Sequence, residues 1–180
     1  MRKVVLFGIA VMLGVLGISA AALANRGHGK DDATNFSARL NGWEEDPSQV
    51  TTGTGSFRAH VVSPTRIDFT LKFRAMEGKV FMSHIHIGSR HESGGISAWL
   101  CGGTTQPACP PGPDGTVEGS IEAADITGPA GQGVEAGNFA DLLRAMRRGE
   151  TYTNVHTEVR APGGEIRGQN RPRGDHDDHH

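Results

Sequence analysis

Cysteine is scarce in this chain, with only Cys101 and Cys109 among 180 residues. The two lie eight positions apart in a segment rich in Gly, Thr and Pro. They lack the CxxC spacing typical of thiolate metal sites. A metal-binding thiol pair is the alternative to a disulfide. In an exported chain this spacing favours one disulfide that closes a short loop. Such a crosslink stabilises a fold by ~2–3 kcal/mol through the entropy of the unfolded chain.

The chain also lacks an excess of positive charge. Its formal net charge is −2 at pH 7, and without Arg2 and Lys3 it keeps 16 basic and 20 acidic residues. A nucleic-acid partner requires a positive footprint, so this balance argues against one.

Catalytic motifs are missing as well. No glycine-rich segment lies between an expected strand and an expected helix, as a phosphate-binding loop would. Ser83 and His86 resemble a nucleophile and base only in type, because a nucleophile also requires a base and an orienting residue in a geometry that the sequence does not supply. The sequence therefore favours a non-catalytic module over an enzyme.

Only one long apolar run is present, at residues 4–23, directly after the basic pair Arg2 and Lys3. Ala22 and Ala24 supply the small residues of a signal-peptidase site. We therefore expect a signal peptide at residues 1–24 and a secreted, periplasmic or cell-surface protein with no membrane segment after cleavage. A transmembrane anchor is the alternative. Residues 25–33 are polar and read as a flexible leader.

Apolar residues alternate with polar ones through most of residues 34–170, a period typical of β-strands. Expected strands cover residues 35–40, 53–62, 67–73, 80–88, 96–100, 116–122, 151–159 and 165–169. One helix is expected at residues 139–148, between Asn138 as N-cap and Gly149 as terminator. The pattern predicts one all-β domain, an antiparallel β-sandwich or Greek-key barrel with a short late helix. Trp43 is expected to anchor the acidic loop at 42–52.

The strand at residues 80–88, VFMSHIHIG, carries the most informative polar pair. Side chains alternate across a strand, so His84 and His86 project from one face and Ile85 and Ile87 from the other. Their Cα atoms lie roughly 7 Å apart, close enough for both rings to reach one ion.

His156 occupies the polar face of the late strand. If the two strands are neighbours, three imidazoles can bind Zn²⁺ or Cu²⁺, with Glu165 or Glu158 as an oxygen ligand or a hydrogen-bond acceptor for an imidazole. A buried hydrogen-bond network without metal is one alternative, and unrelated surface histidines are the other. Glu165 and Arg167 can also be read as a surface ion pair.

Three motifs occur in a distinctive order: FSARLNGWEEDP, SHIHIG, and YTNVHT followed by PGGEIRGQ. Together they resemble the CHRD domain, first defined in chordin, over roughly residues 35–169. The resemblance implies a domain of unsettled biochemical role that also occurs singly in exported bacterial proteins. It does not imply growth-factor antagonism, because the cysteine-rich modules of chordin are missing here. The strand with two histidines is similar to copper–zinc superoxide dismutase in architecture only, since the ligand set of that enzyme cannot be traced.

Two functions follow as expectations. The first is an exported CHRD-type module that binds an extracytoplasmic protein or surface ligand or has a structural role. The second is a zinc or copper protein using His84, His86 and His156, with redox activity if copper is bound. The tail at residues 171–180 is rich in His and Asp and reads as disordered, with weak capture of divalent ions or a solubilising role as its alternatives.

Overall fold

The computed structural model describes residues 30–160 and 163–173. The expected signal peptide, residues 25–29 of the leader and residues 174–180 of the tail lie outside the described residues. Within the described part, no helix is long and apolar enough to cross a membrane.

Nine strands and one α-helix make up most of the described chain. The strands are β1 Asn35–Asn41, β2 Thr54–Ser63, β3 Arg66–Arg74, β4 Val80–Ile87, β5 Ile96–Cys101, β6 Gly115–Glu122, β7 Thr151–Thr157, β8 Ile166–Gln169 and β9 Arg171–Arg173. The helix is α1, Phe139–Arg148. All eight strands expected from the alternation are present, within two residues at most of their ends.

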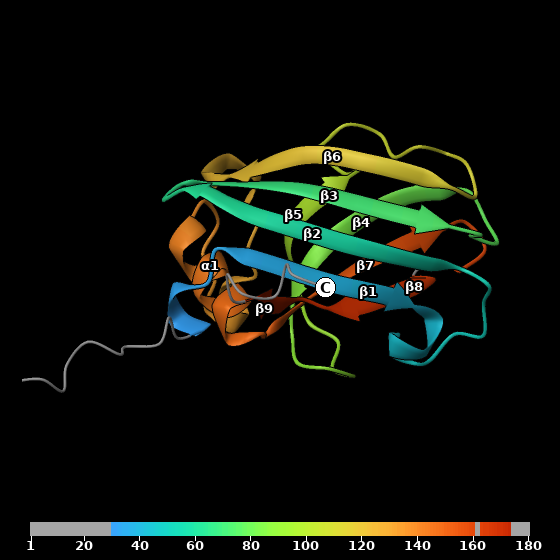
Figure 1. Cartoon of the computed structure of the whole chain (residues 1–180), viewed down its shortest axis with the longest axis horizontal. Coiled ribbons are helices and arrows are strands. Elements are labelled where there is room, and N and C mark those ends of the chain that lie inside the picture. The colour runs from blue at the N-terminus through green and yellow to red at the C-terminus, as the bar shows by residue number, and fades with distance from the viewer. Residues whose placement is uncertain (1–29, 161–162, 174–180) are drawn as a thin grey trace, which may run out of the picture.

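The strands form one antiparallel sheet in the order β5-β4-β7-β8-β1-β2-β3-β6, and β9 pairs with β1. Figure 1 shows β1, β2, β3 and β6 as one wall, with β4, β5 and β7 crossing behind it. The sheet curls until its edges, β5 and β6, approach each other without a ladder between them. The all-β antiparallel prediction is confirmed, in the form of a nearly closed barrel.

The core fills the space between the two walls because each strand presents its alternate apolar side chains inward. On β3, Ile67, Phe69, Leu71 and Phe73 are all buried while the residues between them are exposed or half-buried. The same pattern on β1 and β2 completes a continuous apolar interior. Burial of such side chains is the main stabilising contribution to a fold of this size.

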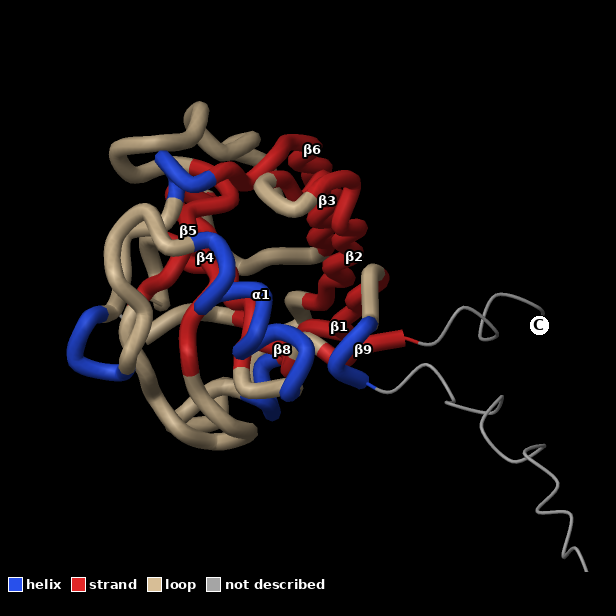
Figure 2. The backbone as a smooth tube through the Cα atoms, turned by 90° about the vertical axis from the view of Figure 1, so that its left-hand side faces the viewer, coloured by secondary structure: helices blue, strands red, loops and turns tan. Residues whose placement is uncertain are grey.

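Helix α1 covers one end of the barrel (Figure 2). Its apolar residues recur at helical spacing and join the core: Phe139, Leu142, Leu143 and Met146. The side chain of Asn138 accepts a hydrogen bond from the backbone N–H of Asp141, which caps the helix. Gly149 ends it in the left-handed conformation, at φ 75°. The predicted helix is confirmed with both of its boundaries.

The disulfide between Cys101 and Cys109 is present and closes the loop that follows β5. From within this loop, the side-chain amide of Gln106 donates a hydrogen bond to the Ser120 carbonyl of β6, at 3.1 Å. The crosslinked loop therefore spans the seam between the two edge strands.

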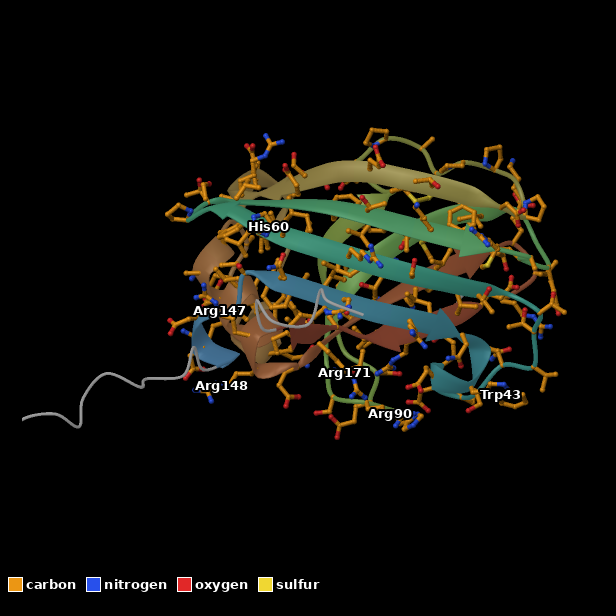
Figure 3. The ribbon with its side chains drawn as sticks, viewed as in Figure 1. Trp43, His60, Arg90, Arg147, Arg148 and Arg171 are labelled. Atoms are coloured by element: carbon orange, nitrogen blue, oxygen red, sulfur yellow. A yellow bond between two sulfur atoms is a disulfide. The ribbon has the colours of Figure 1, made fainter. Side chains whose placement is uncertain are left out.

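Two expectations are wrong at the margins of the fold. Trp43 does not anchor its loop, because its side chain is 64% exposed at the rim of the molecule (Figure 3). The tail does not begin at residue 171, since Arg171–Arg173 form β9 against Asn35–Ser37 of β1. Pro172 lacks a backbone N–H and is tolerated there because β9 is a short marginal strand.

Candidate metal centre

The three histidines singled out from the sequence lie on neighbouring antiparallel strands. The register pairs of β4 and β7 include Met82 with His156, His84 with Asn154 and His86 with Tyr152. Partners in such a pair share one face of the sheet, which here is the face turned away from the core. One ligand nitrogen from each of His84, His86 and His156 lies within 4.8 Å of the other two.

All three imidazoles are shielded from solvent, although they lie on the outer face of the barrel. His84, His86 and His156 are 1%, 9% and 4% exposed. The glycine-rich loop at 88–95 contributes to this cover, because Arg167 donates hydrogen bonds to the carbonyls of Ser89 and Glu92 in that loop. The cluster is therefore an interior site formed between a sheet face and a loop.

Hydrogen bonds fix the protons on two of the rings. His86 Nδ1 lies 2.8 Å from the Gly94 carbonyl, which can only accept, so Nδ1 of this ring carries the proton. Nε2 of the neutral His86 ring is then an acceptor, and His84 Nδ1, 2.7 Å away, donates to it. His84 Nε2 consequently holds a lone pair that is buried and has no hydrogen-bond partner.

Burial keeps these rings neutral. Loss of hydration, with smaller contributions from the neighbouring His86 and His156, lowers the pKa of His84 to about 2. Burial also lowers the pKa of His86, which the Gly94 hydrogen bond opposes and the charge of Arg167 reinforces. Neutral imidazoles are the form that binds metal ions, so at neutral pH each of these two rings has one nitrogen without a proton.

Aromatic side chains hold the rings in place. The Trp99 ring meets His84 edge-on, with centroids 4.8 Å apart, and Tyr152 stacks flat on His86 at 4.7 Å. Phe81 lies against His156 at 6.4 Å. Contacts of this kind restrict ring rotation, and a preorganised set of ligands loses less entropy when it binds.

Arg167 stabilises the cluster from the far side of Tyr152. Its guanidinium carbon lies 3.4 Å from the centroid of the Tyr152 ring, whose other face is covered by His86. The Tyr152 hydroxyl accepts a hydrogen bond from the Gly94 N–H at 3.2 Å. The loop, the tyrosine and the arginine therefore form one packed unit around His86.

The carboxylate of Glu165 does not belong to this group. Its oxygens accept hydrogen bonds from the Thr51 hydroxyl at 2.6 Å, the Glu77 N–H at 2.8 Å and the Thr157 hydroxyl at 2.6 Å. Glu158 is exposed and lies 3.8 Å from the Lys79 ammonium. The reading of Glu165 and Arg167 as a surface ion pair is wrong, because both side chains are fully buried and contact other groups.

Several residues around the site were not recognised from the sequence. Trp99 comes from the neighbouring strand β5, where it is the register partner of His84. Phe81 comes from an irregular position of β4, where the register with β7 shifts. Alternation within residues 96–100 was the one available signal for Trp99. Glu45, buried near Gly164, comes from the loop after β1 and has no signal in the sequence.

Fold and site together define a small all-β module with a buried polar cluster on one sheet face. A family model described as the CHRD domain matches residues 36–170. The chain belongs to the CHRD domain family. Comparison with curated proteins and with solved structures gives no match. The disulfide fits an oxidising compartment.

Proposed function

We propose that this chain is an exported CHRD-domain module that binds a Zn²⁺ or Cu²⁺ ion through His84, His86 and His156. The observation that carries the proposal is the convergence of three buried ligand nitrogens within 4.8 Å. Zn²⁺ and Cu²⁺ are the common ions that accept several imidazoles. The ion has a non-catalytic role, in line with a binding or structural module.

A metal ion can replace the hydrogen bond between His84 and His86. In the metal-free network a proton lies between His84 Nδ1 and His86 Nε2, and an ion can take the place of that proton. Metal binding requires the three rings to adjust, since their ligand nitrogens span up to 4.8 Å. His84 Nδ1 and His86 Nε2 are 2.7 Å apart, whereas nitrogens that share a tetrahedral zinc ion lie ~3.3 Å apart.

Export is supported by two features of the chain. Residues 1–24 combine a basic start, an apolar run and a small-residue cleavage site. The Cys101–Cys109 disulfide belongs to an oxidising environment outside the cytoplasm. The partner of the module is an extracytoplasmic protein or surface ligand.

A redox function is the second candidate, and it depends on copper. Imidazole sites bind Cu²⁺ more tightly than Zn²⁺ in general, so copper wins where both ions are present at equal concentration. Copper that cycles between two oxidation states in this site would support the redox function. A bound ion that cannot be reduced would support a structural role of the ion instead.

Metal analysis of the full chain tests the proposal. The histidines at 176, 179 and 180 are changed to alanine so that the tail does not bind ions. We expect one zinc or copper ion per chain and a higher melting temperature, because an ion present at 100 times its Kd stabilises a fold by about 2.7 kcal/mol. The combined His84→Ala and His86→Ala substitutions should abolish both effects.

His60→Ala is the matched control, since His60 is exposed on β2 and its Nδ1 lies 2.9 Å from Asn35 Oδ1 (Figure 3). It should leave metal content unchanged. A wild-type protein that holds no metal, and whose melting temperature is unmoved by zinc or copper, would contradict the proposal and leave a metal-free CHRD module.

A further inference from the structure

One more buried polar atom lies beside the three imidazoles. Asn154 is the register partner of His84, and its side chain is 4% exposed. Its amide oxygen, Oδ1, is buried and has no hydrogen-bond donor. A buried acceptor without a partner is rare in native proteins and is a mark of a missing ligand or a functional site.

The register of β4 and β7 places Asn154 beside His84. Cross-strand partners lie on one face of a sheet with their Cβ atoms about 4.5–5.5 Å apart, so the amide of Asn154 adjoins the His84 ring. The amide nitrogen, Nδ2, lies 3.1 Å from the place a Cβ on Gly164 would occupy.

We propose that Asn154 Oδ1 is a fourth ligand of the ion, together with one nitrogen from each of the three histidines. This inference rests on the proposed function. An amide oxygen is a neutral donor that is found as a weak ligand at copper sites, and a carbonyl oxygen is a known ligand of divalent ions. Zinc completes a tetrahedral set with four donors.

Four protein ligands make the centre closed. Structural zinc sites have four protein ligands, whereas catalytic sites keep one position open for water or substrate. Here all four donor residues are buried, and Trp99, Tyr152 and Phe81 stand against the three imidazoles. The fourth ligand thus assigns the ion a structural role, the holding together of β4 and β7.

Asn154→Leu tests the inference, because leucine has the same branched side-chain shape as asparagine but no donor oxygen. In the full chain with the tail histidines replaced, zinc affinity is measured by competition with a chromophoric chelator. We expect at least 10-fold weaker binding for Asn154→Leu, and restored or tighter binding for Asn154→Asp, which supplies a charged oxygen in the same place.

Gln169→Leu is the matched control. It removes another partly buried carboxamide of the same sheet face, one whose nitrogen is bonded to the carbonyls of Gly88 and Gly149. Gln169 is the register partner of Tyr152 and not of a histidine. Its replacement should leave zinc affinity unchanged, which separates a ligand effect from a general packing effect.

A crystal structure of the zinc-loaded wild-type chain gives a result that does not depend on the folding of any variant. We expect an Oδ1–zinc distance of about 2.0–2.2 Å. A zinc ion on the three histidines with Oδ1 outside bonding distance, or wild-type affinity in Asn154→Leu, would overturn the fourth ligand and leave the three-histidine site intact. A wild-type protein that binds no zinc or copper would instead refute the metal site itself.

Discussion

At the scale of single residues, Glu45 is an acid whose pKa lies far above its ordinary value. Its side chain is 3% exposed, and its Oε1 atom has no hydrogen-bond partner. Burial raises the pKa of Glu45 to about 8, which the charge of Arg167 opposes and that of Asp46 reinforces. The folded protein therefore keeps a proton on Glu45 at neutral pH, where the unfolded chain has released it.

This proton makes stability depend on pH. Because the folded state binds the proton more tightly, the contribution of Glu45 is fully present below its ordinary pKa of 4.5 and is lost as pH rises through about 8. We expect Glu45→Gln to lose less unfolding free energy than the wild type between pH 5 and pH 8, by on the order of a few kcal/mol. Urea unfolding at several pH values measures this difference.

The comparison with the wild type matters, because His84 and His86 change the unfolding free energy with pH in the direction opposite to Glu45. Their pKa values are lowered, so the unfolded chain takes up protons on them below about pH 6.5 and acid destabilises the fold. This effect is common to both proteins and cancels in the difference. Parallel pH profiles for wild type and Glu45→Gln would contradict the role of Glu45.

Alternation in the sequence was enough to place His84, His86 and His156 on one face, because strand geometry dictates which side chains share a side. It was not enough for Glu165, which lies one residue before β8 and turns to the hydroxyls of Thr51 and Thr157. Contacts with a loop more than a hundred residues away are set by tertiary structure, and no local pattern encodes them.

At the scale of elements, the helix was the most predictable part of the chain because its signals are local. An N-cap side chain, an apolar stripe and a terminal glycine all lie within twelve residues. Strand β9 was missed for the reverse reason. Its three residues, one of them Pro172, have no strand pattern, and they pair with β1.

The cap of α1 allows a direct test of this local encoding. Asn138→Ala removes the hydrogen bond to the Asp141 N–H, and we expect a loss of about 1 kcal/mol in unfolding free energy. Asn138→Asp keeps an acceptor at the same place and should retain most of the stability. Equal unfolding midpoints for Asn138→Ala and the wild type would show that the cap does not stabilise the helix.

At the scale of the whole molecule, the sequence predicts the class of fold but not the order of its strands. Neighbours such as β3 and β6, or β8 and β1, are far apart in the chain, and their pairing depends on closing long loops. The neighbourhood of β4 and β7 was a supposition at the sequence level for the same reason. Since that adjacency gathers the three histidines, the site depends on topology as much as on residue type.

Gly168 lies where β8 meets β1, and it offers a test of that junction. A Cβ at this position would lie 2.2 Å from the Arg39 carbonyl oxygen, a backbone atom that cannot move aside alone. Gly168→Ala should therefore separate the two strands and cost about 1–3 kcal/mol of unfolding free energy. Gly131→Ala, with nothing within 4 Å of its Cβ, is the control and should unfold as the wild type does.

The seam between β5 and β6 has a consequence for how copies of this protein meet. Open strand edges invite edge-to-edge association and aggregation. Here the edge of β5 is occupied by an Ile126 bridge to Ala98, and that of β6 receives the side chain of Gln106 from the crosslinked loop. The barrel is not fully closed, and the disulfide thereby helps to prevent a second copy of the protein from pairing with its open strand edges.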